Sequence, residues 1–307
     1  MAMNSIVYYI VVGTLKLISF LPLNVLYLLS DALCPLLRRV YRRRVVRENL
    51  ISAFPEKSEK ERREIERKFY RFFCDMWLET IKQFSMSKDE MMRHLVFKGM
   101  DPIKSGFDGG KDDAFCYLGH YGNWEWIASL QYWAPGYQCA QIYHSLHNKV
   151  MDRLFLNLRN RYGGLSISMK SALRVLINER NKGSKIWLGL ISDQLPKWEN
   201  IHHFTQFLNQ DTAVFTGGEQ MGKKFDAMMY YMRVLRPRRG YYEVEFIPIA
   251  HDDSKNVPDF QITERYMHLL EEDIRRQPEL WLWTHKRWAR TKQEWEERQK
   301  QHETIHT

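Results

Sequence analysis

The sequence predicts an α/β fold, a mixed central sheet flanked by helices, preceded by an N-terminal apolar membrane-anchoring helix or helix pair. Two observations carry this prediction. From residue 112 onward, short apolar strand-like runs alternate with amphipathic helix-like runs, as in a sheet covered on both sides. Residues 6–37 are almost uncharged and strongly apolar. Because no flexible linker, repeat or low-complexity tract interrupts residues 112–288, we expect one globular domain with appendages among the 307 residues.

The N-terminal apolar segment contains two charged residues, Lys16 and Asp31, and Pro22 lies near its middle. It is too long for a secretory signal core and lacks a small-residue cleavage site, so we expect it to be retained. Each uncharged run beside Lys16 is shorter than the about 20 residues that span a bilayer. One tilted span, a pair of short interfacial helices bent at Pro22, and a buried helix pair all remain open. The composition favours an anchor.

Six arginines follow this segment directly: Arg38, Arg39, Arg42, Arg43, Arg44 and Arg47. A basic cluster beside an apolar segment indicates the cytoplasmic side of a membrane and anionic head groups. The net charge of +9 likewise suits acidic partners. Nucleic acid is the competing interpretation, but no zinc-finger, RNP or helix-turn-helix signature accompanies the arginines, so we expect no nucleic-acid partner.

Residues 58–86 have the pattern of a helix that opens with a capping box at Ser58 and Glu61. Its apolar positions recur every three or four residues and are mostly aromatic: Ile65, Phe69, Phe72, Phe73, Met76, Trp77, Ile81 and Phe84. Such a face is more often core packing than a ligand groove. Near a membrane anchor, it also suits an acyl-chain site.

The strand and helix assignments of the α/β part follow from local pattern. Strands are expected at residues 114–119, 138–143, 186–191, 228–235 and 241–249, the last two forming a hairpin. Helices are expected at residues 124–132, 149–161, 170–180 and 262–276, with Thr263 as a cap for the last one. The charged tail after Trp288 is expected to fray.

The turn between the first of these strands and the first of these helices holds the main candidate for chemistry, His120 and Glu125. On one continuous helix, side chains five residues apart would point about 140° away from each other. Gly119 and Gly122 allow a sharp turn instead, so that the two side chains can meet. A carboxylate that fixes the imidazole tautomer makes the other ring nitrogen a base near neutral pH. From spacing alone, a turn histidine beside a solvated glutamate is an equally good interpretation.

Other kinds of site lack support in the sequence. The pairs His202-His203 and Asp252-Asp253 have no third partner at a metal-binding spacing, so we expect no metal and no cofactor. The four cysteines are scattered and fit thiols in a reducing compartment. Motifs of zinc proteases, serine hydrolases, P-loop NTPases and dinucleotide-binding enzymes are missing.

An ordered series of motifs resembles the bacterial late acyltransferases of lipid A biosynthesis, the lauroyl and myristoyl transferases within the H-x4-(D/E) glycerolipid acyltransferase group. The series covers nearly the whole chain: residues 47–55, the His120–Glu125 motif, Tyr143 with Asn148 and residues 152–154, residues 159–164, residues 192–194, Phe204 with Phe207, and residues 278–288. Two departures are His144-Ser145, where the family often has Arg-Pro, and the lack of a proline in residues 212–219.

The resemblance implies an O-acyltransferase in which His120, oriented by Glu125, activates an acceptor hydroxyl. The donor would be an acyl carrier protein thioester and the acceptor a lipid A precursor, at the cytoplasmic face of the bacterial inner membrane beside anionic membrane lipids. Donors for the developing oxyanion are expected from the backbone of the turn. Further substrate-binding residues are expected to be Gly122, Asn123, Arg159, Arg161, Asp193 and Gln194, with the two arginines on substrate phosphates.

The predicted organisation is an anchor and basic flank at residues 1–47, an acyltransferase domain at 48–290, and a charged tail at 291–307. Two alternatives stay open. The same chemistry could act on another acceptor, such as a glycolipid, an amino-acid lipid or a lysophospholipid. A non-catalytic lipid-binding protein would use only the basic, aromatic surface.

Overall fold

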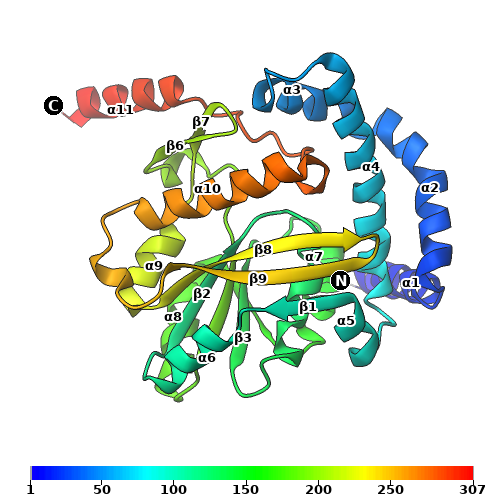
Figure 1. Cartoon of the computed structure of the whole chain (residues 1–307), viewed down its shortest axis with the longest axis horizontal. Coiled ribbons are helices and arrows are strands. Elements are labelled where there is room, and N and C mark those ends of the chain that lie inside the picture. The colour runs from blue at the N-terminus through cyan, green and yellow to red at the C-terminus, as the bar shows by residue number, and fades with distance from the viewer. Residues whose placement is uncertain (1, 307) are drawn as a thin grey trace.

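A mixed seven-stranded sheet forms the centre of the molecule within residues 2–306, the range that the computed structural model describes, with side chains described for residues 8–301 (Figure 1). The strand order is β1-β9-β8-β2-β5-β3-β4. Strands β8, β2, β5, β3 and β4 run parallel, and β9, with its parallel neighbour β1, runs opposite to β8. The bounds are β1 Leu95–Lys98, β2 Asp113–Leu118, β3 Gln138–Tyr143, β4 Leu165–Ser168, β5 Ile186–Ile191, β8 Met228–Arg238 and β9 Tyr241–Ala250. A separate hairpin contains β6 Phe204–Phe207 and β7 Gln210–Ala213.

The helices divide into a group beside the sheet and a group at one end of it (Figure 1). At the end lie α1 Ala2–Ser19, α2 Leu23–Val40, α3 Arg43–Ala53 and α4 Glu59–Lys82. The first three of these helices pack on α4. The others are α5 Lys88–His94, α6 Asp101–Asp108, α7 Lys149–Asn160, α8 Ala172–Asn181, α9 Gly217–Phe225, α10 Gln261–Arg276 and α11 Lys292–His306, with a 3-10 helix at Trp126–Tyr132. The predicted boundary between residues 47 and 48 lies inside α3.

Most predicted elements are confirmed. Strands β3 and β5 have the predicted bounds, β8 and β9 form the predicted hairpin, and Ser58 with Glu61 makes the capping box of α4. Two predictions were wrong. Thr263 does not cap α10, because its backbone N–H and its hydroxyl donate to Glu219 Oε2 at 2.9 and 2.6 Å. The tail after Trp288 forms α11, and Trp295 Nε1 donates to the Ile201 carbonyl at 3.3 Å.

The N-terminal apolar segment is a bent helix pair. No single helix among the described residues is long and apolar enough to cross a membrane, but residues 8–19 and 23–40 pass that test together, with a bend of 112° between them. Helix α2 buries Leu26 against the domain and exposes leucines on its other side, among them Leu28, Leu33 and Leu36. The segment is therefore two helices bent near Pro22, and α2 carries an exposed apolar face.

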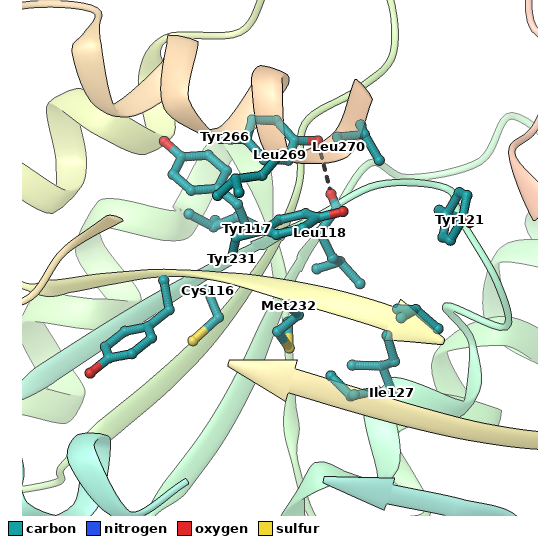
Figure 2. Packing of buried hydrophobic residues seen from close by; sticks show 14 of the residues in the cluster. Cys116, Tyr117, Leu118, Tyr121, Ile127, Tyr231, Met232, Tyr266, Leu269 and Leu270 are labelled. Carbon is teal, nitrogen blue, oxygen red and sulfur yellow. Dashed lines mark hydrogen bonds between the residues drawn. The ribbon is translucent and has the colours of Figure 1, made fainter. Parts of the chain in front are cut away.

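The buried strand β2 holds the chain rigidly where it leaves the sheet. Its side chains alternate between the two layers: Tyr117 stacks on Tyr266 of α10 at 4.7 Å, while Cys116 accepts a hydrogen bond from Trp187 Nε1 on the opposite face. The Tyr266 hydroxyl donates to the Leu118 carbonyl at 3.0 Å (Figure 2). At Gly119 a Cβ atom would lie 2.7 Å from Leu270 Cδ1, so any larger residue here would require the Leu270 side chain of α10 to move. The residue that follows, His120, is therefore firmly placed.

Candidate active site

His120 and Asp193 lie side by side because they follow neighbouring parallel strands. Leu118, the last residue of β2, is paired with Ile191, the last residue of β5. His120 and Asp193 each come two residues later. Carboxyl ends of parallel strands are a common place for functional side chains in α/β folds, and here they bring a histidine and an aspartate together.

Asp193 binds both the ring and the backbone of His120. Its Oδ1 accepts from His120 Nδ1 at 2.6 Å, and its Oδ2 accepts from the His120 backbone N–H at 2.9 Å and from Trp281 Nε1 at 2.8 Å. Asp193 is 2% exposed. Burial would raise the pKa of this carboxyl, but the charge and hydrogen bonds of His120, together with Trp281, lower it to about 2. Asp193 is therefore an anion at neutral pH and holds the proton of His120 on Nδ1.

The His120 side chain is 20% exposed, and its other ring nitrogen is Nε2. The Gln194 side-chain amide nitrogen lies 3.2 Å from it and can donate to its lone pair. The Trp124 ring packs edge-on against the imidazole at 5.1 Å. With Nδ1–H bound to Asp193, Nε2 is unprotonated, and its lone pair can accept a proton from a hydroxyl that takes the place of the Gln194 amide.

Glu125 does not contact this pair. Its carboxylate accepts two parallel hydrogen bonds from Arg159 of α7, from Nε at 2.9 Å and from a terminal nitrogen at 2.7 Å. No hydrogen bond joins Glu125 to His120 in the part of the chain that is described. The hypothesis that Glu125 orients His120 thus disagrees with the geometry, in which Asp193 has that position. The physical reason is that a guanidinium offers a carboxylate two aligned donors, whereas an imidazole offers one.

Three further residues predicted to bind substrate make hydrogen bonds within the protein. The Gly122 N–H, a candidate oxyanion donor, donates to the Leu280 carbonyl at 3.0 Å. The buried Asn123 amide donates to Glu79 Oε2 at 2.8 Å, and its Oδ1 accepts from the Trp126 N–H. Arg161 donates to the Met86 carbonyl at 3.1 Å. Of the predicted substrate-binding set, Asp193 and Gln194 lie at His120, and Arg159 lies with Glu125.

A cavity of about 210 Å³ adjoins His120 through Trp124 and Gln194. Most of its remaining wall is apolar or aromatic and comes from distant parts of the chain: Tyr41, Arg42, Phe73, Trp77, Leu282, Thr284 and His285. Phe73 and Trp77 belong to the aromatic face of α4, whose Phe69 and Phe72 are buried. Phe73 and Trp77 of the predicted aromatic face therefore line the cavity, and Ile65, Phe69, Phe72 and Met76 belong to the core.

The C-terminal segment completes the site in a way that the sequence did not specify. Trp281 supplies the third hydrogen bond to Asp193, and Tyr121 pairs with Trp281 in an antiparallel bridge. His285 Nε2 accepts from the Leu195 N–H at 3.1 Å. Burial, followed by the positive charge of Arg287, lowers the pKa of His285 to about 4, so this ring is neutral at physiological pH. The only hint of this role in the sequence was the run of tryptophans at positions 281, 283 and 288, and such a run is equally consistent with core packing.

No group of three or more His, Cys, Asp or Glu side chains able to hold a metal ion occurs in the described residues. The chemistry that the site offers is proton transfer by His120 beside an apolar cavity.

Residues 2–290 match the family described as bacterial lipid A biosynthesis acyltransferase. No curated protein matches the chain. The match includes the strand ends, the turn and the C-terminal segment that together build the site.

Proposed function

Because the chain belongs to the bacterial lipid A biosynthesis acyltransferase family, we propose that it transfers a fatty acyl chain from a thioester to a hydroxyl group of a lipid A precursor. The observation that carries this proposal is the His120–Asp193 pair next to a largely aromatic cavity, whose wall includes Gln194, the residue that lies at His120 Nε2. A fixed base beside an apolar cavity is what direct acyl transfer to a hydroxyl requires.

In the proposed reaction, His120 Nε2 takes the proton of the acceptor hydroxyl as its oxygen attacks the thioester carbonyl. Asp193 keeps Nδ1 protonated and stabilises the imidazolium that forms. When the tetrahedral intermediate collapses, the C–S bond breaks and the imidazolium returns the proton to the thiolate. The oxygen ester forms directly, with no covalent bond to the enzyme.

The developing oxyanion needs a donor other than the Gly122 N–H, which is already bonded to Leu280. Gln194 is suitably placed, because its amide nitrogen lies 3.2 Å from His120 Nε2, next to where the reacting carbon would sit. An acceptor hydroxyl that binds Nε2 displaces this amide, whose N–H groups then become free to donate to the oxyanion. Glu125 supports the site indirectly by tying the turn after His120 to Arg159 of α7.

The cavity beside His120 is the proposed start of the acyl-chain site. Phe73, Trp77 and Leu282 give it an apolar wall that suits a hydrocarbon chain. The proposed donor is an acyl carrier protein, an acidic partner for a chain with a net charge of +9. The exposed leucines of α2 and the arginines after them are suited to the cytoplasmic face of the inner membrane, where such a precursor would be found.

The test is acyl transfer from acyl carrier protein to a purified lipid A precursor by membranes containing the wild type or the His120→Ala variant. We expect transfer by the wild type and none by the variant at equal protein levels. Retained transfer in His120→Ala would refute the proposed base.

Mass spectrometry of lipids from a deletion strain identifies the acceptor: lipid A short by one acyl chain supports the proposal, and loss of another acylated lipid points to that acceptor instead. Saturable lipid binding without turnover on any thioester would indicate a binding protein.

A further inference from the structure

Three arginines from two helices converge on one buried carboxylate of α4. Glu66 is 1% exposed and accepts hydrogen bonds from Arg38 at 2.9 Å, Arg43 at 2.9 Å and Arg47 at 2.8 Å. Each arginine donates through Nε, and within the described residues no terminal nitrogen of these three guanidiniums donates a hydrogen bond. All three side chains are partly exposed, with fractions between 26% and 42%. Their terminal N–H groups are thus available to a ligand.

The cluster carries more positive charge than its own structure needs. Burial would raise the pKa of Glu66, but the hydrogen bonds from Arg47, Arg38 and Arg43 outweigh burial and lower it. Glu66 is therefore an anion at neutral pH, and arginine is always protonated. One guanidinium would be enough to pair this carboxylate, so three leave an excess of two positive charges.

The backbone adds to this excess. Helix α3 begins at Arg43, with no side-chain cap at Arg42 and no acidic residue in its first turn. The N-terminus of a helix is its positive end, where basic side chains are unfavourable and anions are stabilised. A bound anion would relieve both the arginine excess and the uncapped helix end.

The cluster lies between the catalytic cavity and an apolar surface. Tyr41 and Arg42, which link α2 to α3, line the cavity, and Arg42 also donates to the Thr284 carbonyl at 3.0 Å. The exposed apolar face of α2 continues through Leu36 to Val40, which Tyr41 separates from Arg42 and Arg43. A ligand that spans these features has hydrocarbon chains and an anionic head group.

We propose that Arg38, Arg43 and Arg47 bind the phosphate group of the lipid acceptor whose hydroxyl is acylated at His120. This inference rests on the proposed function and adds the position of the head group. Guanidinium forks match phosphate oxygens with paired N–H donors. Arg159 and Arg161, predicted from sequence for this role, donate instead to Glu125 and to the Met86 carbonyl.

The test is the double substitution Arg43→Gln/Arg47→Gln, which leaves Arg38 to pair Glu66 and so preserves the helix packing. The probes are a phosphorylated, acylated glucosamine disaccharide and the same compound after enzymatic dephosphorylation. We measure kcat/KM for both and take their ratio, the preference for phosphate. Loss of charge-assisted contacts from two guanidiniums should reduce this preference about 10- to 100-fold.

The matched control is Arg63→Gln/Arg67→Gln, which removes the same charge from exposed positions of α4 that pair with Glu59 and Glu64. Its phosphate preference should equal that of the wild type. An unchanged preference in the Arg43→Gln/Arg47→Gln variant, or an equal loss in the control, would overturn the proposed site. So would a loss of binding to phosphatidylglycerol vesicles with the preference intact, because the cluster would then serve bilayer lipids.

The same comparison can be made without turnover, by measuring binding of the two disaccharides to the inactive His120→Ala variant with and without the two arginine substitutions. A phosphate preference there that depends on Arg43 and Arg47 supports the site even where transfer fails. Transfer by the wild type with no such dependence overturns the phosphate site alone and leaves the acyltransferase proposal standing.

Discussion

The substitution Asp193→Asn tests which carboxylate orients His120. In the structure the partner is Asp193, whereas the sequence spacing suggested Glu125. Asparagine keeps the size of the side chain and one of its two oxygens. That oxygen must take the position of Oδ2, which accepts two N–H groups, from the His120 backbone and from Trp281. The amide NH₂ then occupies the position of Oδ1 and donates to His120 Nδ1. The ring is forced into the tautomer with its proton on Nε2, so the proposed base loses its free lone pair.

The expected loss is about 10³- to 10⁴-fold in kcat, which corresponds to about 4–5 kcal/mol of activation free energy. The same exchange of a carboxylate for an amide behind a catalytic histidine has this size of effect in Ser-His-Asp triads. Because two of the three hydrogen bonds are kept and the third is reversed in direction, the free energy of unfolding should fall by only about 1–2 kcal/mol. Single-turnover acyl transfer measures the first quantity and denaturant titration the second.

Asp113→Asn is the matched control, since Asp113 is also buried but lies at the other end of β2. Its kcat should equal that of the wild type. A value of kcat for Asp193→Asn within about tenfold of the wild type, combined with a 10³-fold loss in Glu125→Gln, would refute the assignment of Asp193 and restore the His120–Glu125 dyad.

Four other variants probe the surroundings of the site. Glu125→Gln leaves Arg159 as an unpaired, largely buried charge, so denaturant titration should show a loss of about 3 kcal/mol, partly regained on adding Arg159→Met. Trp77→Ala, at a position 41% exposed, should widen the cavity and shift selectivity toward longer acyl donors in a competition assay, with little change in Tm. Asn123→Ala should lower the free energy of unfolding by about 1–3 kcal/mol with KM unchanged, because it removes a donor to a buried carboxylate. Because the pKa of His285 is lowered from 6.5 to about 4, the unfolded chain gains a proton before the folded one as pH falls. The protein should lose up to about 3 kcal/mol between pH 6.5 and 4, and less in His285→Gln, when titrated with denaturant at each pH.

Whether a strand could be predicted from the sequence depended on how long it is and how deeply it is buried. The inner strands β2, β3 and β5 are six-residue runs of mainly apolar side chains, and their positions were correct within one residue. The missed strands β1, β4, β6 and β7 have four residues each. A run of four residues is too short to show a period, and in Gln210–Ala213 most residues are also polar, so pairing with a partner strand is what makes these segments strands.

Helix ends could be predicted from the sequence only where the capping contact is local. Ser58 and Glu61 act within one turn, so their capping box was visible in the sequence. Thr263 has the right residue type for a cap, but Glu219 from α9 binds its hydroxyl and its N–H. That contact joins residues 44 positions apart, and local spacing carries no information about it.

The same distinction explains the candidate site. Both His120 and Asp193 were identified, each as a polar residue after an apolar strand, but spacing along the chain favoured Glu125 as the partner because it is five residues away. What decides the partner is which strands are neighbours. Since β5 lies beside β2 in register, residues 73 positions apart meet at one edge of the sheet. Glu125, only five positions away, enters a 3-10 turn and binds Arg159 of α7. A candidate catalytic pair assembled from two parallel strands is therefore a property of the sheet order, and the motif around His120 contains only one of its two residues.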